Sequence, residues 1–281
     1  MPPPVSTLFI CADMEGIAGV TGIAQTLVGG FEYEAARRWM TAEVAAVADA
    51  AQAAGAERVV VADSHANAQN LIIDELPRSV ELVRGWPRPL AMMQGVETPN
   101  TFGAMLIGHH CSAQSAAGHL AHTFAGRLLT GVRINGEPAS ETDFNLLIAR
   151  HFNVPVLMVS GDDAFIEHAK QAEPEARGVV TKAAFGRQSA RMRHPDVVLD
   201  ELKAATTEVV QQALGGPADV APPLGDIDLE LVFQRHKQPE LLAYLRGVER
   251  VDGLTIRYRA SDAVDMARFL SFVTHYELQN D

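Results

Sequence analysis

The feature that most constrains the fold is a short apolar run, residues 5–12, that ends at Asp13-Met14-Glu15-Gly16. An unbroken apolar run of this length is typical of a strand buried on both faces. Side chains two positions apart on an extended chain share a side, so the two carboxylates lie together, which is unfavourable unless a cation separates them. A divalent metal is the natural candidate. A polar loop that happens to be acidic is the better explanation of this segment taken alone, so the case for a metal depends on the segments that follow.

The segments that follow repeat the pattern of a buried strand and a helix. Residues 31–55 are rich in Ala and Glu, with apolar side chains at helical spacing, and they predict a helix. Residues 59–62 and the apolar part of 101–108 predict two more buried strands. Strand, helix and strand in this order favour a parallel sheet, so we expect an α/β fold with a largely parallel central sheet and flanking helices.

The last third of the chain changes character. Residues 227–233 and 254–259 alternate apolar and polar side chains, as half-exposed strands do. We therefore expect residues 1–177 to form a metal-binding catalytic α/β domain and residues 178–281 to form an α+β C-terminal subdomain. A single intertwined unit is the alternative to this division.

Composition excludes several classes of protein. The chain has 281 residues, 23 basic and 35 acidic side chains and a net charge of -12, which argues against nucleic-acid binding. No apolar stretch reaches transmembrane length, and the first four residues lack the basic segment of a signal peptide. Two cysteines form no disulfide framework. We expect a soluble, cytoplasmic protein.

Potential metal ligands follow each of the three predicted buried strands. They are Asp13 and Glu15, then Asp63 and His65, then His109 and His110. The carboxyl ends of strands in an open α/β sheet meet at one edge, so these groups can converge. Each histidine alone is more often structural, but together with the carboxylates they suit zinc, with manganese, iron or cobalt as alternatives.

On these residues the chain resembles the D-aminopeptidase family of zinc metallopeptidases, which are found beside dipeptide-transport genes. The resemblance spans nearly the whole chain and is strongest over residues 10–163. The motifs that carry it are Asp13-Met14-Glu15-Gly16-Ile17, Asp63-Ser64-His65, Gly108-His109-His110, Leu120-Ala121-His122-Thr123, Asn135-Gly136-Glu137-Pro138-Ala139-Ser140-Glu141 and Val154-Pro155-Val156-Leu157-Met158-Val159-Ser160-Gly161-Asp162-Asp163.

The resemblance implies a site with two zinc ions per subunit and a short peptide with an N-terminal D-amino acid as substrate. It also implies a ring-like homo-oligomer, with a decamer as the implied size. In this site Asp13 bridges the metals and His122 is the catalytic histidine. The terminal ligands are Glu15, His65, His110 and Glu141. Without the resemblance, Glu141 is only an acid in the first turn of a predicted helix, where the helix dipole favours it.

Two histidine pairs leave a choice. His109 stands where the family usually has an aromatic residue, so either His109 or His110 could be the ligand, and the register with Gly108 favours His110. His119 precedes His122 by three residues, but only His122 keeps the His-Thr pair of the family. We expect His119 to be a loop residue without a part in the chemistry.

The expected chemistry is hydrolysis by a metal-activated water, with His122 as general base, proton donor to the leaving amine or hydrogen-bond donor to the oxyanion. The family resemblance adds a nucleophilic role as a further alternative, which the sequence does not favour over the others. Asp63, Asp162 and Asp163 are expected to be turn and cap residues, and Asp63 could instead orient a ligating histidine. A binuclear metal phosphoesterase and a non-catalytic peptide-binding protein are the competing interpretations, since an α/β fold alone does not discriminate among them.

Overall fold

The computed structural model of the chain describes residues 5–216 and 219–276. The first four residues, on which the expectation of a chain without a leader partly rests, lie outside this part. Seven strands form the main sheet, and neighbouring strands run parallel except for the hairpin of β8 and β9. In spatial order they are β3 (Val80–Val83), β2 (Arg58–Asp63), β1 (Thr7–Ala12), β4 (Thr101–His109), β7 (Val156–Asp162), β8 (Arg177–Gly186) and β9 (Ser189–Met192).

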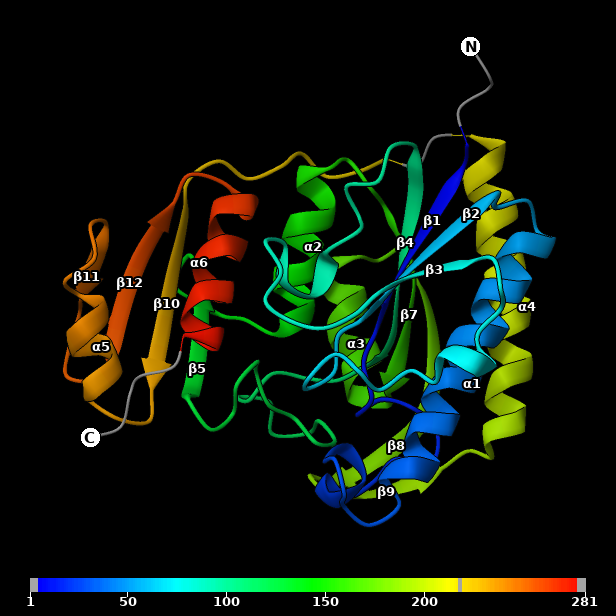
Figure 1. Ribbon diagram of the computed structural model, residues 1–281, viewed down its shortest axis with the longest axis horizontal. Helices are drawn as coiled ribbons and strands as arrows, with labels where there is room; N and C mark the ends of the chain where they lie inside the picture. The colour runs from blue at the N-terminus through cyan, green and yellow to red at the C-terminus, as the bar shows by residue number, and fades with distance from the viewer. Residues whose placement is uncertain (1–4, 217–218, 277–281) are drawn as a thin grey trace.

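Helices cover both faces of this sheet, which explains its continuous apolar strands. On one face α1 (Tyr33–Ala53) and α4 (Pro195–Gly215) pack side by side, as Figure 1 shows, over the side chains of Leu8 and Ile10. On the other face α2 (Glu141–His151) and α3 (Asp163–Ala172) pack over Phe9 and Cys11. The successive residues of β1 thus point into two separate cores.

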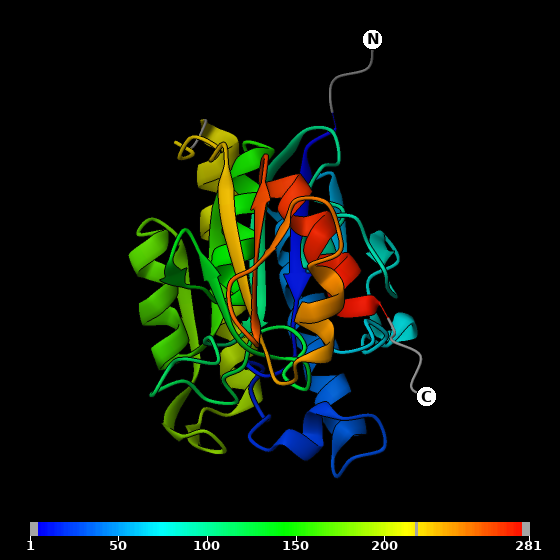
Figure 2. The ribbon, with the colours of Figure 1, turned by 90° about the vertical axis from the view of Figure 1, so that its left-hand side faces the viewer.

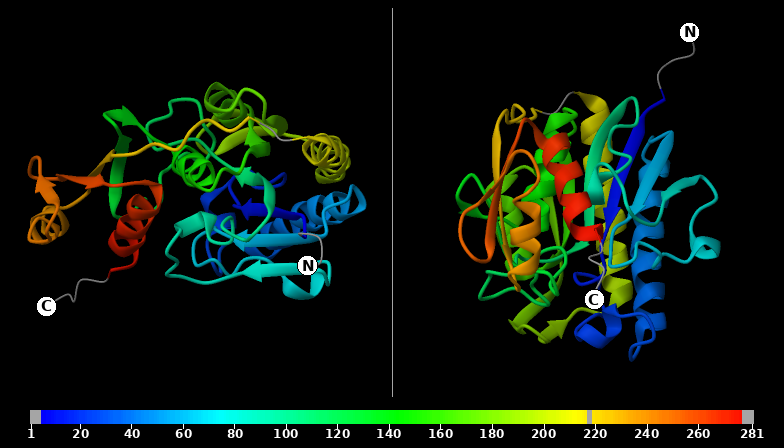
Figure 3. Two further views of the ribbon diagram at one scale, coloured as in Figure 1. Left: turned by 90° about the horizontal axis from the view of Figure 1, so that it is seen from above. Right: turned by 60° about the vertical axis from the view of Figure 1, so that its left-hand side comes forward.

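A second, antiparallel sheet stands beside the main one and faces the viewer in Figure 2. Its spatial order is β11 (Val248–Arg250), β12 (Thr255–Ala260), β10 (Ile227–Phe233), β5 (Leu129–Ile134) and β6 (Glu137–Pro138). Strand β10 alternates buried and half-exposed residues, as its sequence pattern predicts. Helix α6 (Ala263–His275) packs between this sheet and α2, and the short α5 (Lys237–Leu242) lies by β11 and β12 (Figure 3).

The expected α/β class with a largely parallel central sheet is confirmed. Both sheets contain segments from before and after residue 177. Strands β5 and β6 pair with β10 in the second sheet, while β8 and β9 belong to the main sheet and α4 packs on it. A division into domains 1–177 and 178–281 stays a prediction, and this topology favours its intertwined form. In the part of the chain that the structure describes, no helix is long and apolar enough to cross a membrane.

The order of the main sheet reverses between β1 and β4, because β2 and β3 extend it to one side and β7 to the other. Such a switch point leaves a crevice at the carboxyl ends of the strands. The two strand ends approach closely through glycines: a Cβ on Gly16 would lie 2.2 Å from the carbonyl oxygen of His109, and one on Gly108 would lie 2.4 Å from that of Asp13. Within residues 5–216 and 219–276 there are also three short 3-10 helices: η1 (Ile23–Thr26), η2 (Ile73–Glu75) and η3 (Ala91–Met93).

Candidate functional site

Three carboxylates and three imidazoles converge at this crevice, from segments up to 128 residues apart in the sequence. Each follows or begins a secondary-structure element, except for one histidine in the loop between β4 and β5. They are Asp13 and Glu15 after β1, His65 after β2, His110 after β4, His122 in the loop, and Glu141 at the start of α2. The ligand atoms form two groups within 4.8 Å, one of Asp13, Glu15 and His65 and one of His110, His122 and Glu141.

The carboxylate of Asp13 lies between the two groups. Its Oδ1 is 3.1 Å from Nδ1 of His65, and its Oδ2 is 3.4 Å from Nε2 of His110. Nδ1 of His65 also lies 3.0 Å from Oε2 of Glu15. The side chain of Asp13 therefore has the position that a carboxylate shared by two cations requires.

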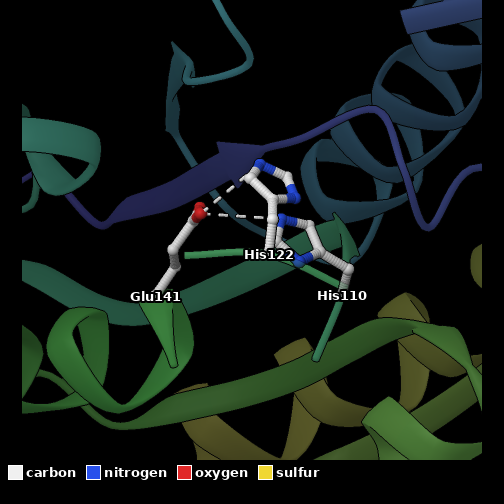
Figure 4. Close-up of side chains that lie close together, drawn as sticks. All are labelled: His110, His122 and Glu141. Atoms are coloured by element: carbon white, nitrogen blue, oxygen red, sulfur yellow. Dashed lines mark ion pairs between the residues drawn. The ribbon is translucent and has the colours of Figure 1, made fainter. Parts of the chain in front are cut away.

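Glu141 faces two stacked imidazoles, as the close-up in Figure 4 shows. Its Oε1 lies 3.7 Å from Nε2 of His110 and 3.8 Å from Nε2 of His122. Glu141 is the first residue of α2, whose cap is Ser140, so the N-terminal end of the helix dipole favours its negative charge. The side chain of Ser140 accepts from the main-chain N–H of Asp143 and fixes this turn.

Each imidazole uses its second ring nitrogen to donate to a main-chain carbonyl. The pairs are His65 Nε2 with Thr26 at 2.8 Å, His110 Nδ1 with Cys111 at 2.9 Å, and His122 Nδ1 with Leu120 at 3.0 Å. When such an imidazole is neutral, this bond holds the proton on the second nitrogen and leaves the nitrogen that faces the carboxylates free to ligate a metal. This arrangement is typical of histidines that ligate metals.

The charges of the cluster are strongly coupled. Burial opposes protonation of His110, but the Glu141 and Asp13 carboxylates outweigh it and raise its pKa to about 10. The pKa of His65 is raised well above its ordinary value because Glu15 and Asp13 likewise outweigh burial. Burial would raise the pKa of Asp13, yet hydrogen bonds from His110 and His65 hold it well below its usual range. The carboxylates thus need positive charge beside them, from protons or from cations.

The two other histidines considered from the sequence, His109 and His119, lie outside the cluster. His109 is buried and stacks on Phe165, with ring centroids 6.2 Å apart, so it occupies an apolar position as an aromatic residue would, and burial lowers its pKa to about 4. The imidazole that reaches the carboxylates is that of His110. His119 is also buried, with its pKa lowered by burial to about 4, and contributes to the packing of the loop rather than to its surface.

The other acidic residues organise turns around the site. Asp63 accepts from the side-chain amide of Asn70 at 2.8 Å, and the same amide donates to the main-chain oxygen of His65 at 2.7 Å. Asp63 therefore orients the His65 segment through Asn70 rather than by touching the imidazole. Asp162 caps α3, and Asp163 accepts from the main chain of β8.

One buried cation that sequence reasoning missed supports the first carboxylate loop. Lys182 is fully buried, and its Nζ donates to the main-chain oxygens of Glu15 at 2.7 Å and Val20 at 2.6 Å. Burial lowers its pKa to about 8. The signal in the sequence is a single lysine inside the otherwise apolar or small-residue run of β8.

A cavity of about 600 Å³ opens over the cluster and lies within the size range of small-ligand sites. Apolar side chains, among them Trp86, Met92 and Leu270, form part of its wall, and Arg127 and Arg187 also line it. No sequence pattern indicates these walls, because their residues come from segments far apart in the chain.

Three comparisons with known proteins agree with one another. The sequence profile of the family described as D-aminopeptidase matches residues 7–272. The D-aminopeptidase of Bacillus subtilis (strain 168) is 29% identical over 280 residues, which cover 97% of this chain and 98% of that protein. Among solved structures, the Zn-dependent D-aminopeptidase DppA from Bacillus subtilis, described as a self-compartmentalizing protease, superposes with a TM-score of 0.84 at 26% identity, covering 97% of this chain and 100% of that one.

Proposed function

The chain belongs to the D-aminopeptidase family, and from this premise we propose that it is a zinc-dependent aminopeptidase that cleaves short peptides with an N-terminal D-amino acid at a two-metal site. The observation that carries the two-metal proposal is the Asp13 carboxylate, whose two oxygens face His65 and His110 separately. A bridging carboxylate needs this disposition, whereas a single metal would not need the second oxygen.

The donor atoms fit zinc. Oε2 of Glu15 and Nε2 of His110 are buried and contact only charged groups of the cluster itself, His65 at 3.0 Å and Asp13 at 3.4 Å, without a well-oriented hydrogen bond. Such atoms are costly unless a proton or a cation satisfies them, and a mixed set of imidazole and carboxylate donors suits zinc. In this proposal Asp13, Glu15 and His65 hold one zinc, and Asp13, His110 and Glu141 hold the other.

Zinc bound there would act as a Lewis acid and lower the pKa of a bound water. The protein supplies the proton chemistry through His122, whose side chain is 27% exposed to the cavity whereas that of His110 is 1% exposed. Its Nδ1 is held by the Leu120 carbonyl, so Nε2 is the atom that can accept a proton and later deliver it to the leaving amine. Donation to the oxyanion is the alternative role of the same atom.

The substrate requires a free amine in this proposal. The carboxylates Asp13, Glu15 and Glu141 all line the cavity and attract a positively charged N-terminus. Fixing the amine, the scissile carbonyl and the side chain at three points accepts one enantiomer, and the family indicates the D-form. The phosphoesterase and the peptide-binding protein gain no support from this family match.

We also propose that the chain assembles into a homo-oligomer, because DppA is a self-compartmentalizing protease. Large apolar side chains that could meet a second copy are exposed in the loop after η1 and at the β8–β9 hairpin, namely Val28, Phe31 and Phe185. A decamer is the size that the family resemblance suggests, and sedimentation velocity would test it. Cytoplasmic location stays a prediction, consistent with the free thiols of Cys11 and Cys111.

The proposed activity is tested by turnover of D-Ala-D-Ala, L-Ala-L-Ala and N-acetyl-D-Ala-D-Ala by the zinc-loaded protein. We expect the free-amine D-dipeptide to be cleaved fastest and the acetylated one to be cleaved at least about a hundredfold more slowly, because acetylation removes the anchoring charge. Asp13→Asn should be inactive, and Asp74→Asn, a change at an exposed position of η2, should retain activity. Equal turnover of the acetylated peptide would refute the aminopeptidase assignment, and preference for the L-peptide would refute only the stereochemistry.

A further inference from the structure

The lining of the cavity carries charges of both signs. It includes the carboxylates of the proposed zinc site and the guanidinium side chains of Arg127 and Arg187. Neither side chain forms a hydrogen bond or an ion pair with any residue that the structure describes. Both are exposed residues, so their charges are available to a molecule that enters the cavity.

Several other exposed arginines have no ion pair in the described part of the chain, among them Arg38, Arg78 and Arg191, so the lack of a partner does not by itself mark a site. Arg127 and Arg187 differ from these because both line the cavity that contains the carboxylate cluster. Two guanidinium groups that a molecule in this cavity can reach point to an anionic group on its ligand.

The segment that carries Arg187 is tied to the loop of the proposed catalytic histidine. Arg187 lies in the turn between β8 and β9, and its main-chain oxygen accepts from the N–H of Leu120 at 2.8 Å. Leu120 in turn accepts from Nδ1 of His122 through its carbonyl. The position of Arg187 relative to His122 is thus set by a chain of two hydrogen bonds.

The segment that carries Arg127 is tied to a proposed ligand. The N–H of Phe124 donates to Oε1 of Glu141 at 2.6 Å, and the side chain of Gln234 donates to the carbonyl of Gly126 at 2.6 Å. The loop before β5 is therefore fixed at both Phe124 and Gly126, next to Arg127. Both arginines project from backbone that the site itself positions.

We propose that Arg127 and Arg187 bind the C-terminal carboxylate of the peptide substrate, so that the enzyme selects short peptides whose two charged ends both lie in the cavity. The inference rests on the aminopeptidase function proposed above and adds the recognition of the far end of the substrate. Guanidinium groups match the planar geometry of a carboxylate and bind it by paired, charge-assisted hydrogen bonds. An extended dipeptide spans only about 7 Å. A cavity of about 600 Å³ that is lined by both the carboxylates and the two arginines can hold a molecule of this length.

A longer peptide or a C-terminal amide would lose this contact. The lost interaction lies away from the scissile bond, so it should weaken substrate binding and appear mainly in KM. A hydrogen bond to a charged group contributes about 1.5–3 kcal/mol, which corresponds to a loss of at least about tenfold in kcat/KM.

The experiment compares D-Ala-D-Ala with D-Ala-D-Ala amide in the zinc-loaded wild type, in Arg127→Gln, Arg187→Gln and the double variant, and in Arg191→Gln. Arg191 lies on β9 and is not part of the cavity wall, so Arg191→Gln is the matched control. We expect the wild type and the control to prefer the free acid by about tenfold or more in kcat/KM. Each single variant should reduce this preference, and the double variant should bring the ratio close to one.

Two outcomes would overturn the inference alone: a wild type that cleaves the acid and the amide equally well, or a double variant that keeps the full preference. The wild-type comparison needs no variant and stands even if a substitution impairs folding. Hydrolysis of neither dipeptide by the zinc-loaded wild type would overturn the proposed function and this inference together. The two failures are thus distinguishable in one experiment.

Discussion

His110 and His122 stack with ring centroids 4.1 Å apart and planes 14° apart, and both direct Nε2 to the same oxygen of Glu141. Their surroundings differ. The side chain of His110 is 1% exposed and also contacts Asp13, whereas that of His122 is 27% exposed and lines the cavity. In the proposed mechanism His110 is a ligand and His122 a proton carrier, and their direct contact would keep the proton transfer next to the metal site.

This contact predicts different losses for the two histidines. His122→Ala should keep zinc and lose about a hundredfold or more in kcat, because it removes a proton carrier but no ligand. His110→Ala should lose zinc as well as turnover. Elemental analysis and kcat measured on the same samples test both expectations. Zinc loss in His122→Ala would make this residue a ligand, since its ring nitrogen also lies within the second group of donor atoms.

Lys182 is expected to stabilise the fold through the loop that carries Glu15. Lys182→Met leaves the buried carbonyls of Glu15 and Val20 without their donor and should cost about 2–4 kcal/mol in the free energy of unfolding. Denaturant titration measures this cost. Lys203→Met, at an exposed position of α4, is the control and should be nearly neutral. A Lys182→Met protein as stable as the control would show that these two bonds do not hold the loop.

Glu43 predicts a pH dependence of stability. Its carboxyl is buried, accepts one N–H from Ala18 at 2.8 Å, and burial raises its pKa to about 8 against about 4.5 in the unfolded chain. Between these values the folded state binds the proton and the unfolded state does not, so the free energy of unfolding falls as pH rises. The stability that the protonated carboxyl contributes is fully present below pH 4.5 and is lost as pH rises toward 8. The free energy of unfolding changes by at most about 1.4 kcal/mol per pH unit.

Glu43→Gln should remove this slope, because the amide does not titrate. Denaturant titrations of the zinc-loaded proteins at pH 5, 6.5 and 8 provide the measurement. The variant should gain stability relative to the wild type as pH rises over this window. A difference between the two proteins that stays constant with pH would contradict the raised pKa.

Much of the site could be predicted because a parallel sheet collects the carboxyl ends of its strands at one edge. Asp13, His65 and His110 follow three successive strands of the predicted α/β core, so their convergence follows from the fold class. Glu141 could not be found this way, since an acid in the first helical turn has a sufficient local explanation in the helix dipole. Only the family resemblance singled it out.

Other features depend on contacts that no local pattern encodes. Strand β5 has an ordinary apolar pattern, which does not indicate that it pairs with β10 in a separate sheet. The short β3 and β9 lack a strong periodic signal and were not expected. Neither was helix α3, although its buried residues Phe165, Ile166 and Ala169 recur at helical spacing. Arg127 and Arg187 lie in loops far apart in the sequence, and only the folded chain brings them to one cavity.

The central claim is that Asp13 is shared by two zinc ions, and the most direct test is the number of zinc ions held per chain after exhaustive dialysis of the wild type, Asp13→Asn and Glu15→Gln. If Asp13 bridges the metals, the wild type should hold two zinc ions per chain, because both carboxylate oxygens of Asp13 are used. Glu15→Gln should hold about one zinc ion per chain, because it removes a ligand from one group only. Asp13→Asn should hold close to none, because its amide cannot bridge two cations. Two tightly held zinc ions per chain in Asp13→Asn would show that Asp13 is not shared by the two metals.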